Sequence, residues 1–413
     1  MVEALDIHNT EKALAIAVEF LKRGGIRRQA KENIKPLSDK NIQLILDHYK
    51  ARTLEGKSLG TRRREIHLLI NIARMLDKDF DTATKEDLKN LVLKIDLSNH
   101  SLWVKCKLRL LIRHFYKWLK YGDDYCQHNE FPEEVKWIKK NFKKSDEPQI
   151  MANELITEEQ MKNLIDMAEH PRDKAFMSIL TESGARIGEI GNLRIKDVYQ
   201  DEFSYLIHIK GKTGERTDRV YYSDNYIAGW LNIHPIKDNP DAPLWVNFKK
   251  HTQMKYPSLL KLVNKISLKA GLKGKHNPHL FRHSRVTINA RKGMSEPLLK
   301  KYFGWDADSR MLSRYSHLAS EDANEAILKM YGVKNEKKID NILKPNLCEI
   351  CHYQNSPTDN FCGRCARPLN KETALTYNHY KHEASKILNE LCENPRFVEV
   401  LKAFMAENKS PKS

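Results

Sequence analysis

The chain of 413 residues has no apolar run long enough to cross a membrane. The longest apolar run near its start, Ala13–Val18, is far shorter than the ~20 residues that a spanning helix needs. The opening residues include Glu3 and Asp6, whereas a secretory signal peptide begins with positive charge. We therefore expect no membrane segment and a cytoplasmic location.

Acidic residues are missing from two long stretches. Residues 242–295 contain no Asp or Glu but twelve Lys and Arg, and residues 98–120 contain six basic residues and no acid. The formal net charge of the whole chain is +17. A basic excess of this size favours polyanionic partners, chiefly nucleic acid or an anionic membrane. Two such stretches in separate parts of the chain suggest a polyanion that is held from two sides.

The sequence also lacks a glycine-rich loop for nucleotide phosphates. Gly-Lys-Thr-Gly at 211–214 does not have the G-x-x-x-x spacing that precedes the lysine in a P-loop. β-Branched and aromatic residues on both sides of this turn instead predict a hairpin over 205–222. We therefore expect no chemistry driven by ATP.

The cysteines do not form a disulfide pattern. There are seven, an odd number, and four of them make two Cys-x-x-Cys pairs ten residues apart: Cys348, Cys351, Cys362 and Cys365. Four thiolates at this spacing predict a zinc ribbon that holds a structural Zn2+ in a reducing compartment, with Gly363 permitting the tight turn after Cys362. A redox dithiol and a coincidental cluster are the alternatives.

Helical periodicity dominates the first part of the chain. Residues 31–122 carry four helical patterns and predict a helical domain, with Ser38 and Thr61 expected to cap two of its helices. Trp103 is expected on the broad apolar face of the last of these helices. We expect residues 1–30 to be an N-terminal arm and residues 123–150 to be a linker.

A second domain is expected over residues 151–335. It opens with Thr157 and Gln160 at the spacing of a capping box. Helical patterns and a single hairpin make this domain α+β, with one small sheet. The zinc ribbon at 345–370 and a helical tail at 371–413 complete a chain that is mainly α.

The second domain contains residue types suited to phosphate chemistry in a defined order. These are Arg186, Lys212 at the hairpin tip, His279 and Arg282 at H-x-x-R spacing, then Trp305 and Tyr315. The order resembles that of the tyrosine recombinase family, the phage integrases and Xer-type resolvases, over about residues 155–330. The resemblance implies a helical core-binding domain of the SAM-like type, which clamps duplex DNA together with the catalytic domain.

The family chemistry implies a role for each of these residues. A phosphodiester gathers negative charge in its transition state, and two planar guanidiniums, here Arg186 and Arg282, stabilise that charge best. Tyr315 would attack the phosphate and form a 3′-phosphotyrosine bond. Its hydroxyl, with a pKa near ~10, needs a base, for which His279 is the candidate.

Other positions would assist this chemistry. Lys212 would protonate the leaving 5′-oxygen. Trp305 would donate its indole N–H to a phosphate oxygen, and it cannot do the acid-base work of the histidine that many family members have there. Glu189 and His283 would support the site.

Plainer interpretations exist for three of these residues. Arg186 can form a helix salt bridge with Glu189, and both roles can hold for this acid. Lys212 can be an ordinary turn lysine. His279 can cap the helix that Pro278 opens.

The resemblance also implies partners and the absence of a catalytic cofactor. The partners would be double-stranded DNA recombination sites, a homo-tetramer on synapsed DNA, and accessory directionality factors. Candidate DNA contacts are basic residues in the helical domain: Arg62, Arg63, Arg64, Lys105, Lys107 and Arg109. The alternative functions are DNA relaxation like that of a type IB topoisomerase, and a DNA-binding adaptor whose catalytic residues are unused.

Overall fold

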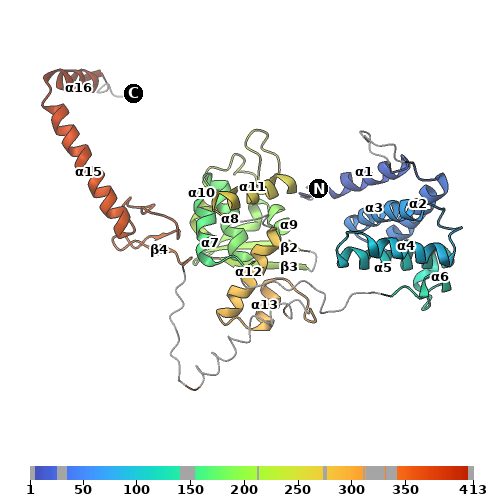
Figure 1. The fold of residues 1–413 in the computed structure, drawn as a ribbon. Helices are drawn as coiled ribbons and strands as arrows, with labels where there is room; N and C mark the ends of the chain where they lie inside the picture. Colours follow the sequence, from blue (N-terminus) through green and yellow to red (C-terminus); the bar gives the residue numbers. More distant parts are fainter. Residues whose placement is uncertain are drawn as a thin grey trace. The chain divides into compact units, whose positions relative to one another are not determined.

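The computed structural model describes residues 5–25, 35–139, 154–211, 214–272, 277–309, 312, 331 and 342–407 of the chain, with side chains described up to 404. It divides into two compact units (Figure 1). The helical unit comprises residues 6–149, and the second unit comprises residues 1–5 and 150–413. The expected mainly α fold is confirmed, because helices make up most of the described elements.

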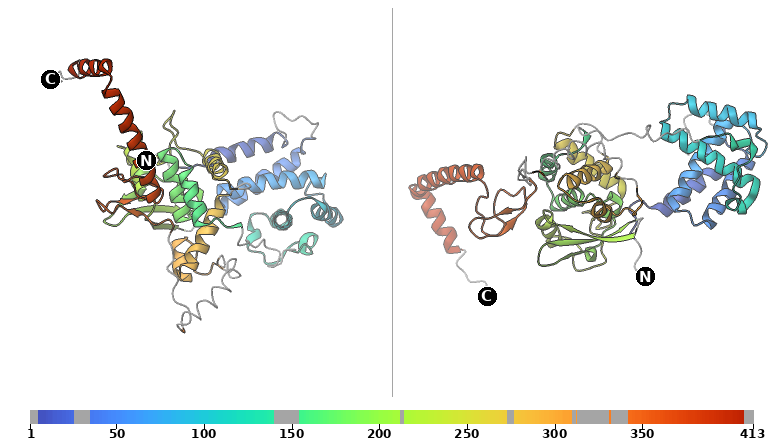
Figure 2. Two further views of the ribbon diagram at one scale, coloured as in Figure 1. Left: turned by 60° about the vertical axis from the view of Figure 1, so that its left-hand side comes forward. Right: turned by 90° about the horizontal axis from the view of Figure 1, so that it is seen from below.

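The helical unit packs its helices against one another around a single apolar core (Figures 1 and 2). Its elements are α1 (Thr10–Lys22), α2 (Asp39–Leu54), α3 (Leu59–Leu76), α4 (Lys85–Leu97), α5 (Leu102–Tyr121), the 3-10 helix η1 (Gly122–Cys126) and α6 (Glu133–Lys136). Phe80 and Phe115 lie at the centre of the core, with their ring centroids 4.6 Å apart.

The prediction that residues 1–30 form an N-terminal arm is wrong, because α1 belongs to the helical unit. Leu14, Ala17 and Leu21 of α1 are buried in the core, and the helix packs against α3. These residues recur every three or four positions, which places them on one face of the helix. A single amphipathic helix cannot bury that face alone, so it packs on the nearest apolar surface.

The predicted start of the linker, at residue 123, is also too early. Residues 122–139 pack on the helical unit, where Tyr125, Val135 and Ile138 are buried in the core. These apolar residues are widely spaced in a polar segment, and this sparse pattern conceals their burial. The rest of the expected linker, residues 140–150, lies outside the described residues.

Helix capping follows the expected chemistry, with one shift in position. Ser38 caps α2, as predicted, because its hydroxyl accepts a hydrogen bond from the backbone N–H of Asn41 at 3.2 Å. Thr61 does not cap α3; Ser58 does, and it accepts from the Thr61 N–H at 3.4 Å. Both hydroxyls can accept at a helix start, and the helix begins one turn earlier because Leu59 packs on the core.

Trp103 does not lie on the buried face of α5. Its side chain is 51% exposed, whereas Leu108, Ile112 and Phe115 are buried. Five residues separate Trp103 from Leu108, which is about 140° around a helix, so the two side chains cannot share one face.

The second unit combines helices with a small sheet. Its helices up to residue 302 are α7 (Glu158–Asp166), α8 (Pro171–Ser183), α9 (Ile187–Gly191), η4 (Ile195–Asp197), α10 (Asp224–Asn232), α11 (Tyr256–Lys269), α12 (Pro278–Arg291) and α13 (Glu296–Tyr302). The predicted capping box at Thr157 is confirmed, because both of its hydrogen bonds with Gln160 form. Trp230, Trp245, Phe176 and Phe281 are among its largest fully buried side chains.

The sheet contains one strand more than expected. The predicted hairpin forms between β2 (Tyr205–Gly211) and β3 (Gly214–Val220), and Gly211 pairs with Gly214 across the turn. A third strand, β1 (Val198–Gln200), pairs antiparallel with β2 (Figure 2). Three residues are too few to show the alternation that identifies a strand from sequence.

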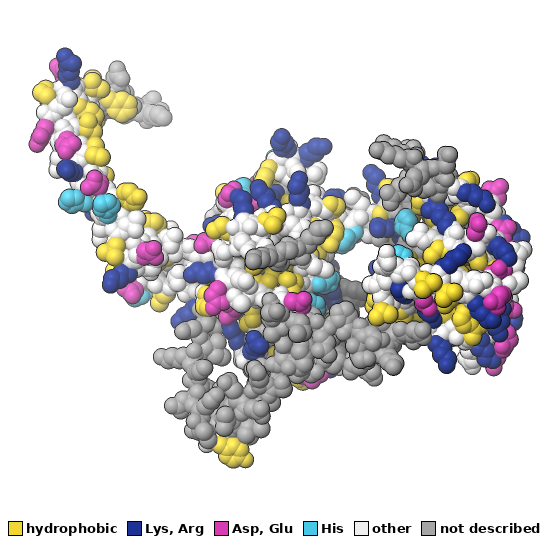
Figure 3. Space-filling view, viewed as in Figure 1, with side chains coloured by type: hydrophobic (Ala, Val, Ile, Leu, Met, Phe, Trp, Pro, Cys, Tyr) yellow, Lys and Arg dark blue, Asp and Glu magenta, His cyan; other side chains and the backbone are white. Residues whose placement is uncertain are grey.

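The C-terminal part contains a two-stranded sheet and two helices. Strands β4 (Asn346–Leu347) and β5 (Gln354–Asn355) are antiparallel, and α15 (Lys371–Cys392) and α16 (Pro395–Glu407) follow. Exposed apolar side chains occur along both helices (Figure 3). They include Leu375 and Ile387 on α15 and Phe404 on α16. Among the helices that the structure describes, none is both long and apolar enough to span a membrane.

We expect Leu21→Ala to destabilise the helical unit by about 2–5 kcal/mol, because it leaves a cavity in a packed core. Ile16→Ala is the matched control, since Ile16 lies on the same helix and is 54% exposed. Hydrogen exchange of α3 peptides in the full chain measures both effects. If Leu21→Ala left the protection of α3 unchanged, α1 would be an arm after all.

Candidate active site

The site is built where α8 ends. Gly184 follows α8 with φ 57°, a left-handed conformation that favours glycine. A Cβ at this position would lie 2.9 Å from the ring of Phe303 and 3.0 Å from Cβ of Arg285. Glycine therefore lets the chain turn sharply here, where no larger residue fits, and this turn presents Arg186 at the start of α9.

Arg186 and Glu189 form the predicted salt bridge. Nη1 of Arg186 donates to Oε1 of Glu189 at 2.6 Å, and the Arg186 backbone N–H donates to Oε2 at 3.1 Å. The Arg186 side chain remains 31% exposed, whereas that of Glu189 is only 5% exposed. The carboxylate therefore fixes a guanidinium that still reaches solvent.

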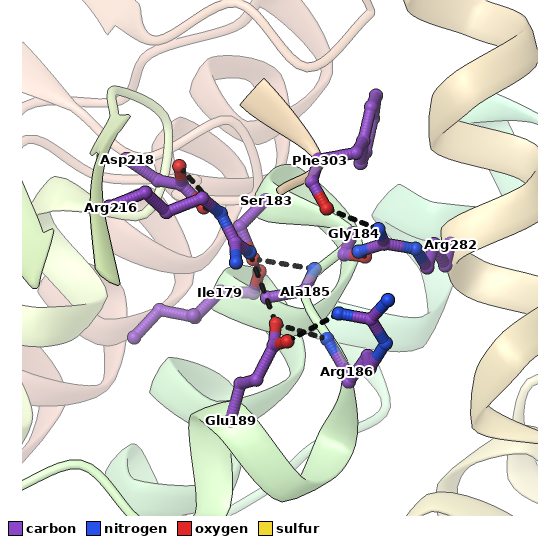
Figure 4. A network of polar contacts seen from close by, with 10 residues as sticks. All are labelled: Ile179, Ser183, Gly184, Ala185, Arg186, Glu189, Arg216, Asp218, Arg282 and Phe303. Carbon is purple, nitrogen blue, oxygen red and sulfur yellow. Dashed lines mark hydrogen bonds and ion pairs between the residues drawn. The ribbon is translucent and has the colours of Figure 1, made fainter. Parts of the chain in front are cut away.

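Arg282 is the most constrained of the predicted site residues. It projects from α12 and is 4% exposed, and its Nη1 donates to the carbonyl oxygen of Gly184 at 3.2 Å. Its Nη2 donates to the carbonyl oxygen of Phe303 (Figure 4). The guanidinium carbon lies 5.2 Å from the ring centroids of both Phe303 and Trp305. Two carbonyls and two aromatic rings thus hold Arg282 close to the turn that leads to Arg186.

His279 occupies the first turn of α12 and is exposed. It does not cap this helix; Asn277 does, by accepting from the His279 backbone N–H at 3.0 Å. Partial desolvation, together with the positive charges of Arg282 and Arg186, lowers the pKa of His279 below its usual value. The imidazole is therefore held in its neutral form, which can accept a proton. His283, one turn later, is half-buried.

Trp305 presents an unsatisfied donor. Its indole Nε1 is buried and has no hydrogen-bond partner within the part of the chain that the structure describes. Gly304, with φ 59°, makes the turn that places this ring beside Arg282. A buried N–H without a partner is costly, and a ligand oxygen would satisfy it.

Two of the predicted catalytic residues lie outside the described residues. They are Lys212 and Tyr315. The structure therefore brings together Arg186, Glu189, Arg282, His279 and Trp305. The roles of these residues, and those of Lys212 and Tyr315, remain predictions.

Sequence reasoning missed a second layer of charged residues beneath the site. Arg216 and Asp218 point inward from β3, and Arg216 donates to Glu189 (Figure 4). Glu182 of α8 accepts from the backbone N–H groups of Tyr221, Tyr222 and Ser223. The signal was available in β3, where residues 216, 218 and 220 alternate toward the interior and two of them are charged.

Burial and the surrounding charges shift the pKa values of the two carboxyls beside Arg216 in opposite directions. Burial raises the pKa of Asp218 to about 6, although Arg216 opposes this rise. Burial also acts to raise the pKa of Glu189, but Arg216 and Arg186 outweigh it, and the pKa lies below its usual value. Glu189 is therefore an anion at neutral pH and is available to both arginines.

The four cysteines converge as their spacing predicts. The Sγ atoms of Cys348, Cys351, Cys362 and Cys365 all lie within 4.8 Å of one another, an arrangement that can hold a metal ion. Gly363 does not supply the tight turn, because it is absent from the residues with positive φ. Each turn instead closes on the residue after its second cysteine, His352 with φ 54° and Ala366 with φ 56°.

The cysteine-bearing segment is hydrogen-bonded to the second unit's α10 region. Nδ2 of Asn225 donates to the carbonyl oxygen of Gln354 at 2.7 Å, and the hydroxyls of Tyr226 and Thr358 lie 2.5 Å apart. Nε2 of Gln354 donates to the Tyr221 hydroxyl at 2.5 Å. None of these contacts includes a predicted catalytic residue.

The candidate DNA contacts of the helical unit divide into two groups. Arg63, Arg64 and Lys107 are exposed, and Arg64 and Lys107 line the same hollow between α3 and α5. The others are engaged within the unit. The guanidinium of Arg109 is buried and paired with Asp96, Nζ of Lys105 donates to the Asp96 carbonyl, and Nη1 of Arg62 donates to Thr53.

Comparisons with known proteins agree on the family. Residues 154–322 match the model of the phage integrase family. The chain is 26% identical over 281 residues to tyrosine recombinase XerA of Pyrococcus horikoshii, which covers 67% of this chain and 89% of the relative.

Two solved structures show the fold. XerH recombinase bound to a palindromic difH substrate has a TM-score of 0.53 and 19% identity, covering 80% of this chain and 99% of that chain. A lambda integrase tetramer bound to a Holliday junction has a TM-score of 0.50 and 12% identity, covering 72% of this chain and 88% of that chain. Residues 154–322 therefore match the phage integrase family, and the chain is similar to tyrosine recombinases in sequence and in fold.

Proposed function

We propose that this chain is a site-specific DNA recombinase that cleaves and rejoins DNA strands through a 3′-phosphotyrosine bond at Tyr315, without ATP. The observation that carries this proposal is the convergence of Arg186, Arg282 and the indole N–H of Trp305, which has no hydrogen-bond partner among the described residues. Donors and positive charge gather there, with a buried anion behind them, as a site for a phosphodiester requires.

The geometry accounts for the stabilisation of a phosphate in its transition state. Glu189 holds Arg186 from one side and leaves the guanidinium partly exposed. Arg282 is held rigidly by carbonyl oxygens, so little reorganisation is needed when charge develops. Trp305 would add one hydrogen bond to a phosphate oxygen.

The proton transfers follow from the proposed roles of three residues. Tyr315 attacks the phosphorus atom, its hydroxyl proton passes to the neutral imidazole of His279, and Lys212 protonates the departing 5′-oxygen. The phosphotyrosine bond conserves the energy of the broken phosphodiester. Rejoining is the reverse reaction, in which a 5′-hydroxyl displaces Tyr315.

Double-stranded DNA is the proposed partner of both units. Exposed Arg63, Arg64 and Lys107 would contact phosphates from the helical unit. In the second unit, Lys249, Lys250, Lys261 and Lys265 of the acid-free stretch are exposed. Phosphate contacts of this kind position a protein without reading the sequence.

The assembly is proposed by analogy with the lambda integrase tetramer on a Holliday junction. We propose that this chain also acts as a homo-tetramer on two synapsed sites, and that directionality factors are additional partners. No disulfide joins any of the seven cysteines, all of which lie in the described residues, and this fits a reducing cytoplasmic location.

The cysteine cluster is proposed to bind one structural Zn2+ per chain. Four thiolates suit tetrahedral zinc, and the contacts with α10 lie apart from the predicted catalytic residues. The ion would hold the two Cys-x-x-Cys turns together and take no part in strand cleavage.

The first prediction concerns the nucleophile. Tyr315→Phe is expected to abolish covalent attachment to a nicked suicide DNA while leaving DNA affinity nearly unchanged, because one hydroxyl is a small part of a charged interface. Denaturing gels detect the adduct, and filter binding measures affinity. Tyr331→Phe is the control, since Tyr331 is 81% exposed, and it should form the adduct normally. A protein–DNA adduct with Tyr315→Phe would show that another residue attacks.

The second prediction concerns pH. Because the pKa of His279 is lowered, the proton-accepting form persists below the ordinary titration point of histidine. The second-order rate constant for suicide cleavage, measured in single turnover at low DNA concentration, should therefore fall only below about pH 6.5. His279→Gln should remove this acid limb, and His283→Gln is the control that keeps it. An acid limb above about pH 7 would exclude His279 as the base.

The third prediction concerns the metal. Protein purified without added metal should contain one zinc per chain by elemental analysis, and replacing Cys362 and Cys365 together by serine should remove it. Suicide cleavage should remain within a few-fold, because Glu182 holds the Tyr221–Ser223 turn independently of the ribbon. Cys392→Ser, an exposed cysteine outside the cluster, is the control. Metal-free wild-type protein, or loss of cleavage with the zinc, would contradict a structural zinc.

A further inference from the structure

Arg216 of β3 lies beneath the predicted catalytic residues without being one of them. Its side chain is 11% exposed. Its Nη2 donates to Oε2 of Glu189 at 3.1 Å, and its Nε lies 3.1 Å from both carboxylate oxygens of Asp218. Figure 4 shows the guanidinium between these two carboxylates, with Arg186 on the far side of Glu189.

The carboxylate of Glu189 is shared by two arginines. Oε1 accepts from Nη1 of Arg186, and Oε2 accepts from both the Arg186 backbone N–H and Arg216. The position of this carboxylate therefore depends on Arg216 as well as on Arg186. A shift of Glu189 would change the direction in which the Arg186 guanidinium points.

Two glycines allow the hairpin and the turn before Trp305 to pack closely on the ion pair of Arg216 and Glu189. A Cβ at Gly211, the residue before Lys212, would lie 2.8 Å from Oε1 of Glu189. A Cβ at Gly304, the residue before Trp305, would lie 2.9 Å from Nη1 of Arg216. The hairpin and the turn of Trp305 thus both pack directly on the Arg216–Glu189 pair.

The charges explain why an arginine is needed at this position. Glu189 and Asp218 have side chains only 5% and 1% exposed, and each lies in contact with Arg216. Removing the guanidinium would leave two neighbouring buried carboxyls with one counter-charge fewer, and a buried ion that loses its partner is strongly destabilised. Lysine could not replace it fully, because an ammonium cannot span both carboxylates as a planar fork does.

We propose that Arg216 is a positioning residue for DNA cleavage: it fixes Glu189, and through this carboxylate it sets Arg186, the base of the Lys212 hairpin and the Trp305 turn in one arrangement. The proposal rests on the function proposed above. In this role Arg216 itself does not touch the phosphate, since its Nε and Nη2 face carboxylates and its side chain is nearly buried.

Single-turnover cleavage of the nicked suicide DNA tests this role in the full chain. Arg216→Ala is expected to lower the cleavage rate at saturating DNA by about 100-fold, the effect of a small misplacement of a catalytic group. The DNA concentration at half-saturation should stay unchanged, because Arg216 makes no DNA contact. Arg219→Ala is the matched control on the same strand, where Arg219 is 44% exposed and paired with Asp201, and it should cleave normally.

A double variant separates positioning from a general structural role. If Arg216 acts through Arg186, then Arg216→Ala should lower the rate of an Arg186→Ala protein by much less than it lowers the wild-type rate. Fully additive losses, or an Arg216→Ala rate within about three-fold of wild type, would overturn the proposal. Should Arg216→Ala not fold, Arg216→Lys gives the same comparison, because it keeps the charge but pairs with only one carboxylate. Wild-type protein that forms no adduct would refute the proposed function instead.

Discussion

The buried carboxylate of Glu189 is the constraint on which the rest of the site depends. It lies almost out of water and is kept ionised by Arg186 and Arg216. The α8–α9 turn, the hairpin and the turn before Trp305 all contact the ion pair of Glu189 and Arg216. Losing one partner of such a buried pair typically costs about 3–5 kcal/mol, so the three elements are held in one arrangement. A phosphate that approaches Arg186 therefore meets a guanidinium whose direction is already set.

The fold could be predicted in outline because its signals are local. Periodicity predicted the helices, and hydroxyl spacing predicted the caps at Ser38 and Thr157. The errors arose where tertiary packing, and not the local sequence, determines which residues are buried. Residues 122–139 look polar, yet Tyr125, Val135 and Ile138 complete the core of the helical unit. Trp103 is apolar and helical, but its angular position on α5 leaves it exposed.

The predicted part of the site consists of residues whose chemical types and order along the chain are typical of phosphate chemistry. Arg186, Glu189, His279, Arg282 and Trp305 gather in the second unit, and the four cysteines converge as their spacing requires. Arg216 and Asp218 were missed because the alternation along β3 does not by itself show which face of the hairpin is buried. Docking of the cysteine-bearing segment on Asn225 and Tyr226 depends on contacts about 130 residues apart, which no local pattern records.

The central claim is that Arg186 and Arg282 act by neutralising charge on the non-bridging phosphate oxygens. A suicide DNA with a methylphosphonate at the scissile position tests this directly, because a neutral methyl group replaces one charged oxygen. Single-turnover cleavage rates of wild type, Arg186→Ala and Arg282→Ala are compared on this DNA and on the ordinary phosphodiester. The account predicts that the losses caused by both substitutions shrink strongly on the neutral substrate. Losses of equal size on the two substrates would contradict it, because the arginines would then serve some purpose other than charge stabilisation.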